Sequence, residues 1–402
     1  MNPKWQTVIW LAIAEFLAMS LWFSASAVTP ALSAAWELTP GGVAWLTMSV
    51  QIGFVVGAFL SALFNVADVW PPRFVFATGA FLGAAANALI ALSVDGLAGA
   101  IGLRFVTGFA LAAVYPVGMK IMATWMKEDR GFGIGLLVGA LVLGSASPHL
   151  IRGFGGVDNW RLVMYTASGL AFLAGVIALF VGKMGPYQGP PATFRWAHIL
   201  ATFRDPGIRL ANFGYLGHMW ELYAMWSWIA LFLLESYRLS GLQNFETMAS
   251  LMTFAVIGIG GVGSLLAGWL ADRWGRAYTT ILSMALSGTA ALTIGLFFGR
   301  SPLLISIIAL IWGFAIVADS AQFSTAVSEL ADRKYVGTAL TMQTSVGFLL
   351  TLVSIRLIPI LVEWVGWEYA FTGLALGPLF GIWAMWKLCQ SPAAMQMAGG
   401  RG

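Results

Sequence analysis

Two glutamates, Glu15 and Glu221, stand inside apolar stretches that are long enough to cross a lipid bilayer. Both begin the pattern Glu-x-x-Ala-Met-x-x-Trp, and the two copies lie 206 residues apart in a chain of 402 residues. A carboxylate inside a membrane span is energetically costly and marks a candidate functional site. Because the two acids occupy matching places in two halves of the chain, they indicate a duplicated membrane protein with a site between its repeats.

Three further ionisable residues, Arg104, His218 and Asp319, fall within apolar stretches of similar length. His218 precedes Glu221 by about one helical turn, so the two side chains share one face of a predicted helix. Low-dielectric surroundings favour the neutral form of a carboxyl group, whereas a nearby arginine favours the charged form. Buried acids together with a buried arginine are therefore typical of a site that binds and releases protons.

The composition indicates a membrane protein. Hydrophobic residues make up 59% of the chain and charged residues only 9%, whereas soluble domains contain roughly 25% charged residues. One cysteine, Cys389, excludes a disulfide framework, and the three histidines form no metal-ligand spacing. A net charge of +4 is compatible with a nucleic-acid partner, but the basic residues are spread along the chain and form no single patch. We therefore expect no nucleic-acid partner. The sequence therefore predicts neither a metal nor a cofactor.

Apolar runs of about 20 residues can cross the ~30 Å hydrocarbon core of a bilayer as helices. The sequence predicts twelve such spans, at residues 6–31, 42–65, 73–94, 97–119, 131–151, 160–182, 209–234, 246–270, 278–299, 302–327, 336–358 and 365–388. Gly-Pro and Asp-Pro pairs within 183–208 are typical of a linker. We therefore expect an all-α integral membrane protein, with a six-helix bundle at 1–182, a cytoplasmic linker at 183–208 and a second six-helix bundle at 209–402.

The lysines and arginines predict the orientation of the spans. With the N-terminus inside, 15 of the 21 basic residues face the cytoplasm, four face outside, and Arg104 and Arg356 lie within spans. Basic residues are retained on the cytoplasmic side. We therefore expect a multi-pass protein of the cytoplasmic (inner) membrane with both termini cytoplasmic, and we expect it to be a monomer.

Other short segments repeat at nearly the same offset. An Ala-Asp pair ends at Asp68 and again at Asp272, 204 residues later, and a Gly-Phe-Ala segment begins at Gly108 and again at Gly313, 205 residues later. Because the matches occur in the same order in both halves, the sequence predicts duplication of a six-helix unit.

The segment from Gly268 to Arg276, between the eighth and ninth predicted spans, reads Gly-Trp-Leu-Ala-Asp-Arg-Trp-Gly-Arg. It matches the cytoplasmic signature Gly-x-x-x-Asp-Arg-x-Gly-Arg of the major facilitator superfamily, and the chain resembles that family over essentially its whole length. Gly268 suits a close approach of helices, Gly275 suits a turn, and Asp272 suits an ionic contact at the inner face.

The resemblance implies two pseudo-symmetric six-helix bundles, with a central cavity lined by spans 1, 4, 7 and 10. It also implies that the signature loop is a charge latch. The predicted gating residues are Gly268, Asp272, Arg273, Gly275 and Arg276, with Asp68 and Arg73 in the counterpart loop between spans 2 and 3. That counterpart replaces the glycine turn with Pro-Pro, so a latch there is built differently. The alternative is a basic loop that only sets topology.

Arg104 begins a segment similar to the family's Arg-x-x-Gln-Gly-x-Gly element, with Thr107 in place of the glutamine. In proton-coupled members this arginine sits beside an acid, so Glu15 and Arg104 are predicted to be the proton-coupling pair. The predicted substrate-binding residues are His218, Glu221, Trp22, Trp228, Asp319 and Gln51. The alternatives are a structural ion pair in place of the coupling pair, a packing role for His218, and an inner-gate or packing role for Asp319.

These features favour a secondary active transporter that moves a small solute by alternating access and is coupled to protons. The chain contains no Gly-x-x-x-x-Gly-Lys-[Ser/Thr] loop and no His-Glu-x-x-His or Gly-x-Ser-x-Gly motif, so neither a transport ATPase nor an enzyme is expected. A non-transporting receptor or scaffold on the same fold and an anion uniporter or exchanger without proton coupling are the alternatives. The expected partners are a small-molecule substrate, protons and the lipid bilayer.

The predicted cavity leaves the charge of the substrate open. Its three acids, set against Arg104, give a net charge of −2, which favours a cation or a protonated solute. If Arg152 and Arg356 also point inward, the net charge is zero and an anion is equally compatible.

Overall fold

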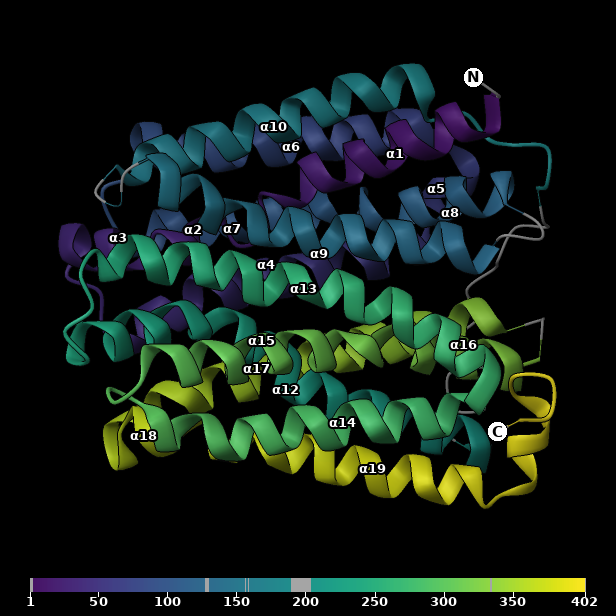
Figure 1. The fold of residues 1–402 in the computed structure, drawn as a ribbon. Helices are drawn as coiled ribbons and strands as arrows, with labels where there is room; N and C mark the ends of the chain where they lie inside the picture. The colour runs from purple at the N-terminus through teal and green to yellow at the C-terminus, as the bar shows by residue number, and fades with distance from the viewer. Residues whose placement is uncertain are drawn as a thin grey trace. The chain divides into compact units, whose positions relative to one another are not determined.

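The computed structural model describes residues 3–126, 130–155, 157, 159–188, 204–332 and 335–401. Within these ranges the chain forms helices and no strand, which confirms the predicted all-α fold (Figure 1). The helices up to residue 181 are α1 (Pro3–Met19), α2 (Ser24–Ala27), α3 (Thr29–Trp36), α4 (Pro40–Leu63), α5 (Val66–Val69), α6 (Pro72–Ser93), α7 (Leu97–Leu111), α8 (Tyr115–Trp125), α9 (Arg130–Gly155) and α10 (Trp160–Val181). The later helices are α12 (Pro206–Leu239), α13 (Phe245–Trp274), α14 (Arg276–Thr293), η2 (Ile294–Phe297), α15 (Pro302–Ala318), α16 (Ser320–Leu330), α17 (Val336–Val365), α18 (Trp367–Ala370), η3 (Phe371–Ala375), α19 (Leu376–Cys389) and η4 (Pro392–Gln396).

Among the described residues, ten helical segments are long and apolar enough to cross a membrane, and they coincide with predicted spans 2–6 and 8–12. Predicted span 1 differs because α1 has 17 residues and ends at Met19, where the chain turns. Predicted span 7 corresponds to α12, which has 34 residues and is long enough, but His218 and Glu221 make it more polar. These two spans are therefore recognised by their place in the fold rather than by apolar length alone.

The chain divides into two compact units. The first comprises residues 1–191 and 229–255, and the second comprises residues 192–228 and 256–402. The division passes through α12 and α13. Residues 189–203, which make up most of the predicted linker, lie outside the described residues.

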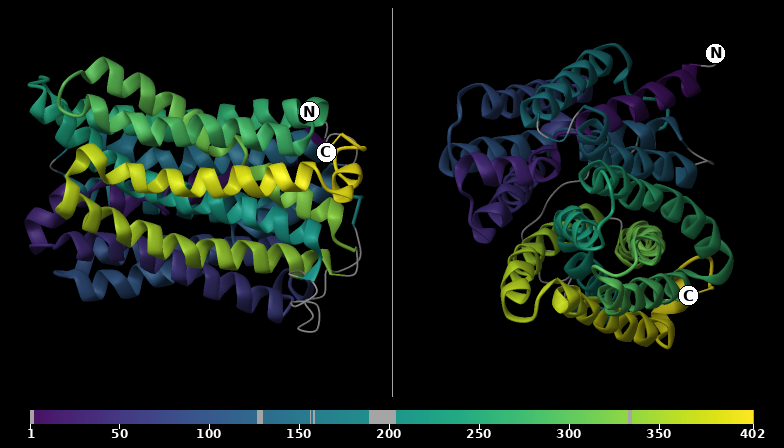
Figure 2. Two further views of the ribbon diagram at one scale, coloured as in Figure 1. Left: turned by 90° about the horizontal axis from the view of Figure 1, so that it is seen from below. Right: turned by 60° about the vertical axis from the view of Figure 1, so that its left-hand side comes forward.

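Within the first unit, α1 packs beside α9 and α10, α10 packs beside α6, and α4 packs beside α7 (Figure 1). A buried apolar cluster that includes Leu32, Leu46, Ile90 and Met164 joins several of these helices. Within the second unit, α14 packs beside α15 and α19 (Figure 2).

Two glycines from the repeated Gly-Phe-Ala segment lie at equivalent close approaches between helices. A Cβ atom at Gly108 of α7 would stand 1.8 Å from the carbonyl oxygen of Val50 in α4, and a Cβ at Gly313 of α15 would stand 1.8 Å from that of Val256 in α13. No other residue fits at such distances, so each position requires glycine. Each unit thus repeats the same packing, which supports the predicted duplication.

Three of the predicted spans are broken. Span 1 breaks at 20–23 between α1 and α2, span 4 at 112–114 between α7 and α8, and span 10 at Asp319 between α15 and α16. A break frees backbone groups from their helical partners, and inside a membrane protein these groups need other partners. At the break in span 1, Arg104 supplies such partners, because it donates to the carbonyl oxygens of Leu21 and Trp22.

Candidate functional site

Glu15 is fully buried in α1. Neither of its carboxyl oxygens has a hydrogen-bond partner among the residues that the structure describes. The carboxyl group lies against the first turn of α8, where a Cβ atom at Gly118 would come within 2.7 Å of Oε2. An ionised carboxylate buried without a partner costs far more free energy than a neutral acid. A charged Glu15 would therefore need a partner that the described residues do not supply in this conformation.

Arg104 is also fully buried, but no ion pair joins it to Glu15 in the described part of the chain. Its Nη1 donates to the carbonyl oxygen of Leu21 at 2.8 Å, and its Nη2 donates to the carbonyl oxygen of Trp22. Its Nε donates to the carbonyl oxygen of Leu46 in α4 at 3.3 Å. Leu21 and Trp22 form part of the break in span 1. Arg104 therefore satisfies freed backbone carbonyls and ties span 4 to spans 1 and 2.

Asn87 of α6 completes this buried cluster. Its Oδ1 accepts hydrogen bonds from Ser24 Oγ at 2.7 Å and from Arg104 Nη1 at 3.4 Å. Its Nδ2 donates to the carbonyl oxygen of Met164 at 3.0 Å and to Ser168 Oγ at 3.1 Å. Asn87 was not among the predicted site residues, because its only signal in the sequence is an uncharged amide within an apolar run.

The other predicted substrate-binding residues of the first unit are buried too. Trp22 is 3% exposed, and its ring centroid lies 5.0 Å from that of Phe54 in an edge-on contact. Gln51 of α4 is fully buried. Trp22 thus contacts Arg104 through its backbone carbonyl oxygen. The carboxyl group of Glu15 lies against α8 instead.

Glu221 of α12 is 2% exposed and accepts two hydrogen bonds within the second unit. Ser287 Oγ of α14 donates to Oε2 at 2.8 Å, and Trp312 Nε1 of α15 donates to Oε1 at 2.7 Å. The ring of Trp312 packs edge-on against Phe371, with centroids 5.1 Å apart. Each carboxyl oxygen thus has a neutral donor, and Glu221 joins three helices of the second unit.

The structure brings His218 to Asp319 rather than to Glu221. Nδ1 of His218 lies 2.8 Å from Oδ1 of Asp319, and both side chains are buried. The ring of His218 also lies near those of Tyr215 and Phe323, at centroid distances of 6.1 and 5.6 Å. His218 and Asp319 thus form a close buried contact between α12 and the break in span 10.

Trp228, the remaining predicted contact of α12, is 3% exposed. Its Nε1 donates to the carbonyl oxygen of Ile355 in α17 at 3.0 Å. The indole N–H therefore joins two helices of the second unit in this conformation.

In the first unit, the loop between spans 2 and 3 is tied to span 4. Asp68 forms an ion pair with Lys120 of α8, and Lys120 Nζ also donates to the carbonyl oxygen of Ala67 at 2.6 Å. Arg73 instead lies over the ring of Phe74, with its guanidinium carbon 4.8 Å from the centroid. Lys120 was not among the predicted gating residues.

In the second unit, the signature loop is tied to span 10 through Arg276. Its Nε and Nη2 donate to Glu329 of α16 at 2.8 and 2.7 Å, and its Nη1 donates to Gln322 at 3.0 Å. Asp272 lies 3.7 Å from Arg276, and its side chain is 73% exposed. Arg273 lies over the ring of Trp269, 3.6 Å from its centroid. Glu329, which forms the principal ion pair of this loop, was not among the predicted gating residues.

The two glycines of the signature loop differ. Gly275 has a φ of 95°, a value that favours glycine, so the predicted turn is confirmed. The interpretation of Gly268 as a site of close helix approach is wrong for this structure, because a Cβ atom there would meet nothing within 4 Å.

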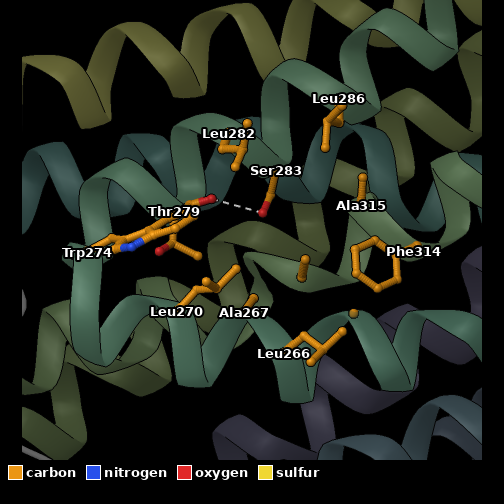
Figure 3. A pocket seen from close by; sticks show the side chains of 12 residues that line it. Leu266, Ala267, Leu270, Trp274, Thr279, Leu282, Ser283, Leu286, Phe314 and Ala315 are labelled. Atoms are coloured by element: carbon orange, nitrogen blue, oxygen red, sulfur yellow. Dashed lines mark hydrogen bonds between the residues drawn. The ribbon is translucent and has the colours of Figure 1, made fainter.

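An apolar recess of about 60 Å³ lies between α13, α14 and α15 of the second unit (Figure 3). Its two hydroxyl groups already donate within α14, Thr279 Oγ1 to the carbonyl oxygen of Gly275 and Ser283 Oγ to that of Thr279, each at 2.9 Å. None of the predicted substrate-binding residues lines this recess. It is therefore not assigned to the substrate. In the described ranges, no group of three or more His, Cys, Asp or Glu residues is placed to hold a metal ion.

Comparisons with known proteins agree with this architecture. The chain is 28% identical to a putative niacin/nicotinamide transporter of Bacillus subtilis over 277 residues, which cover 66% of this chain and 65% of that protein. It is 22% identical to a hexuronate transporter of Escherichia coli over 327 residues, which cover 73% of each chain. Among solved structures, a nucleoside transporter matches with a TM-score of 0.73 at 16% identity, over 95% of this chain and 99% of that one.

The family model of the Major Facilitator Superfamily matches residues 11–354 and 246–396, which together take in most of the chain. The repeated halves, the signature loop and the helical architecture are consistent with this match. The chain belongs to the Major Facilitator Superfamily, and it is a multi-pass membrane protein of that family.

Proposed function

We propose that this protein is a proton-coupled, secondary active carrier, which moves a small organic solute across the cytoplasmic membrane by alternating access, and that Glu15 binds the proton. The observation that carries the proposal is a difference among the buried acids. Glu221 accepts two hydrogen bonds and Asp319 contacts His218, whereas the carboxyl group of Glu15 has no hydrogen-bond partner in the described structure.

Proton binding at Glu15 is linked to conformation in this proposal, because the ionised carboxylate needs a partner or water. Arg104 does not supply that partner here, since its donors are bound to the carbonyl oxygens of Leu21 and Trp22 at the break in span 1 and to that of Leu46 in α4. Release of the proton therefore requires a conformation in which Glu15 reaches water or a cation. The break in span 1, which begins five residues after Glu15, is the place where such a rearrangement can occur.

The solute is proposed to be a small organic acid. One relative is named for niacin and nicotinamide and another for hexuronates, and of these compounds niacin and the hexuronates carry a carboxylate, whereas nicotinamide is neutral. His218, Asp319 and Trp228 remain proposed solute contacts of the second unit, and Trp22 and Gln51 those of the first. A monomer with both termini in the cytoplasm also remains part of the proposal.

The test is solute-driven proton movement in proteoliposomes that contain the full chain. Nicotinate and glucuronate are added outside, and the internal pH is followed with a trapped indicator. The proposal predicts that entry of one of these solutes is accompanied by a change in internal pH that empty liposomes do not show. Solute entry at an unchanged internal pH would contradict it.

Anion exchange without proton coupling is a second candidate. Arg152 of the first unit is only 4% exposed, and a buried positive charge of this kind favours an anionic solute. An exchanger would take up the labelled anion only when the liposomes are loaded with an anion, and it would leave the internal pH unchanged. The same proteoliposomes therefore separate the two candidates.

A further inference from the structure

His149 and Arg152 form a buried basic pair in α9 that the proposed mechanism does not use. His149 is 1% exposed and Arg152 is 4% exposed. The two residues are three positions apart on one helix, so their side chains share a face. Pro148, just before them, cannot donate to the carbonyl oxygen of Gly144. Ser147 Oγ donates to that oxygen at 2.7 Å instead, so the helix continues.

His149 is the more unusual member of the pair. Neither of its ring nitrogens has a hydrogen-bond partner in the described part of the chain. An imidazole carries at least one N–H in every protonation state that proteins populate. Such a buried donor without an acceptor destabilises the conformation that contains it. The ring of His149 therefore presents a donor for which an acceptor is missing in this conformation.

Arg152 is held in place beside it. Its Nη1 donates to Ser250 Oγ of α13 at 2.9 Å, and that hydroxyl donates to the carbonyl oxygen of Glu246, also at 2.9 Å. The neighbouring Gly153 lies close to α13, since a Cβ atom there would come within 2.7 Å of Leu251 Cδ2. The guanidinium group is thus a positioned, buried positive charge.

Arg356 of α17, 204 residues further along the chain, occupies the corresponding place in the second repeat and is exposed. Burial of the arginine is therefore a property of the first repeat alone. The exposed Arg356 also provides a matched control.

We propose that His149 and Arg152 form an anion-binding subsite, which takes a carboxylate group of the solute. An N–H of His149 supplies one hydrogen bond, and the guanidinium group of Arg152 supplies the balancing charge. This inference rests on the proposed function, because it identifies which part of an organic-acid solute the first unit recognises. A neutral analogue would leave the charge of Arg152 without its counter-ion and would bind more weakly.

The test compares acids with neutral analogues of similar shape on the purified full chain. Thermal unfolding is followed with nicotinate against nicotinamide, and with glucuronate against glucose, because a ligand that binds the folded state raises its stability. The wild type should be stabilised more by one of the acids than by its neutral analogue. His149→Phe and Arg152→Gln should each weaken binding of that acid about tenfold or more, while Arg356→Gln should leave it unchanged.

Arg152→Lys and His149→Gln serve as conservative variants. Each retains a donor and should preserve part of the preference for the acid, whereas a merely structural role would make every variant lose thermal stability without changing that preference. A wild type that does not distinguish acid from neutral analogue, or a preference that survives in both His149→Phe and Arg152→Gln, would overturn the inference. Binding needs no gradient, so a preserved acid preference together with failed proton coupling would refute the proposed function while leaving the subsite intact.

Discussion

Individual buried acids in this protein differ in the partners that the fold gives them. Glu221 has a donor for each oxygen, Asp319 has an imidazole, and Glu15 has no hydrogen-bond partner in the described residues. The sequence predicted that all three would be buried in membrane spans, but it could not predict their partners. Ser287 and Trp312 lie 66 and 91 residues from Glu221, and no local pattern connects them to it.

Replacing Glu221 with glutamine should lower the stability of the folded protein. Glutamine has one carbonyl oxygen, which can accept from Trp312, but its amide NH₂ then faces Ser287. The hydroxyl of Ser287 must turn to accept instead of donate, and the carboxyl oxygen that it now contacts is lost. We expect Glu221→Gln to reduce the free energy of unfolding by about 1–3 kcal/mol, measured by thermal or chemical denaturation in detergent. Unchanged stability together with weaker solute binding would show instead that Glu221 serves the solute, as the sequence predicted.

At the scale of helices, the breaks in the spans explain why one predicted pairing is not formed. Glu15 and Arg104 lie on spans 1 and 4 as expected, but the sequence does not reveal that span 1 stops at Met19. The carbonyl oxygens just beyond the end of this helix then accept hydrogen bonds from Arg104, which is why Arg104 does not pair with Glu15. By contrast, the equivalence of Gly108 and Gly313 could be predicted. Each stands at a close helix contact that only glycine allows, so both halves of the sequence have glycine at this position.

A double-mutant cycle distinguishes the two roles of Arg104. If it caps backbone carbonyls, Arg104→Gln should cost at least about 2 kcal/mol of stability, and adding Glu15→Gln should not restore it. We expect a coupling energy below about 0.5 kcal/mol, as for independent sites. Restoration of stability in the double mutant would reveal an ion pair between the two residues.

The signature loop provides a second test at this scale. Arg276 makes two hydrogen bonds to Glu329, whose side chain is 26% exposed, whereas the side chain of Asp272 is 73% exposed. Glu329→Gln should therefore cost about 1–3 kcal/mol of stability, and Asp272→Asn should cost less than about 0.5 kcal/mol. Equal losses, measured by denaturation of the two variants, would show that the exposed aspartate is as important as the ion pair.

For the whole molecule, the repeat preserves packing but not charge. The loop after span 2 is tied to span 4 by Asp68 and Lys120, and the loop after span 8 is tied to span 10 by Arg276 and Glu329. The loop supplies the acid in one case and the base in the other. The sequence predicted the duplication and the loops, but not these ion pairs, because their second members lie about 50 residues away.

The central claim is that Glu15 carries the proton, and Glu15→Gln tests it most directly. The solute identified by thermal shift is followed in proteoliposomes under two conditions, accumulation driven by a pH gradient and counterflow at equal pH. Glu15→Gln should abolish accumulation and retain counterflow, because glutamine mimics the protonated acid and cannot release a proton. Glu363→Gln, at an exposed carboxylate of α17, should retain both. Accumulation at the wild-type level in Glu15→Gln would contradict the account.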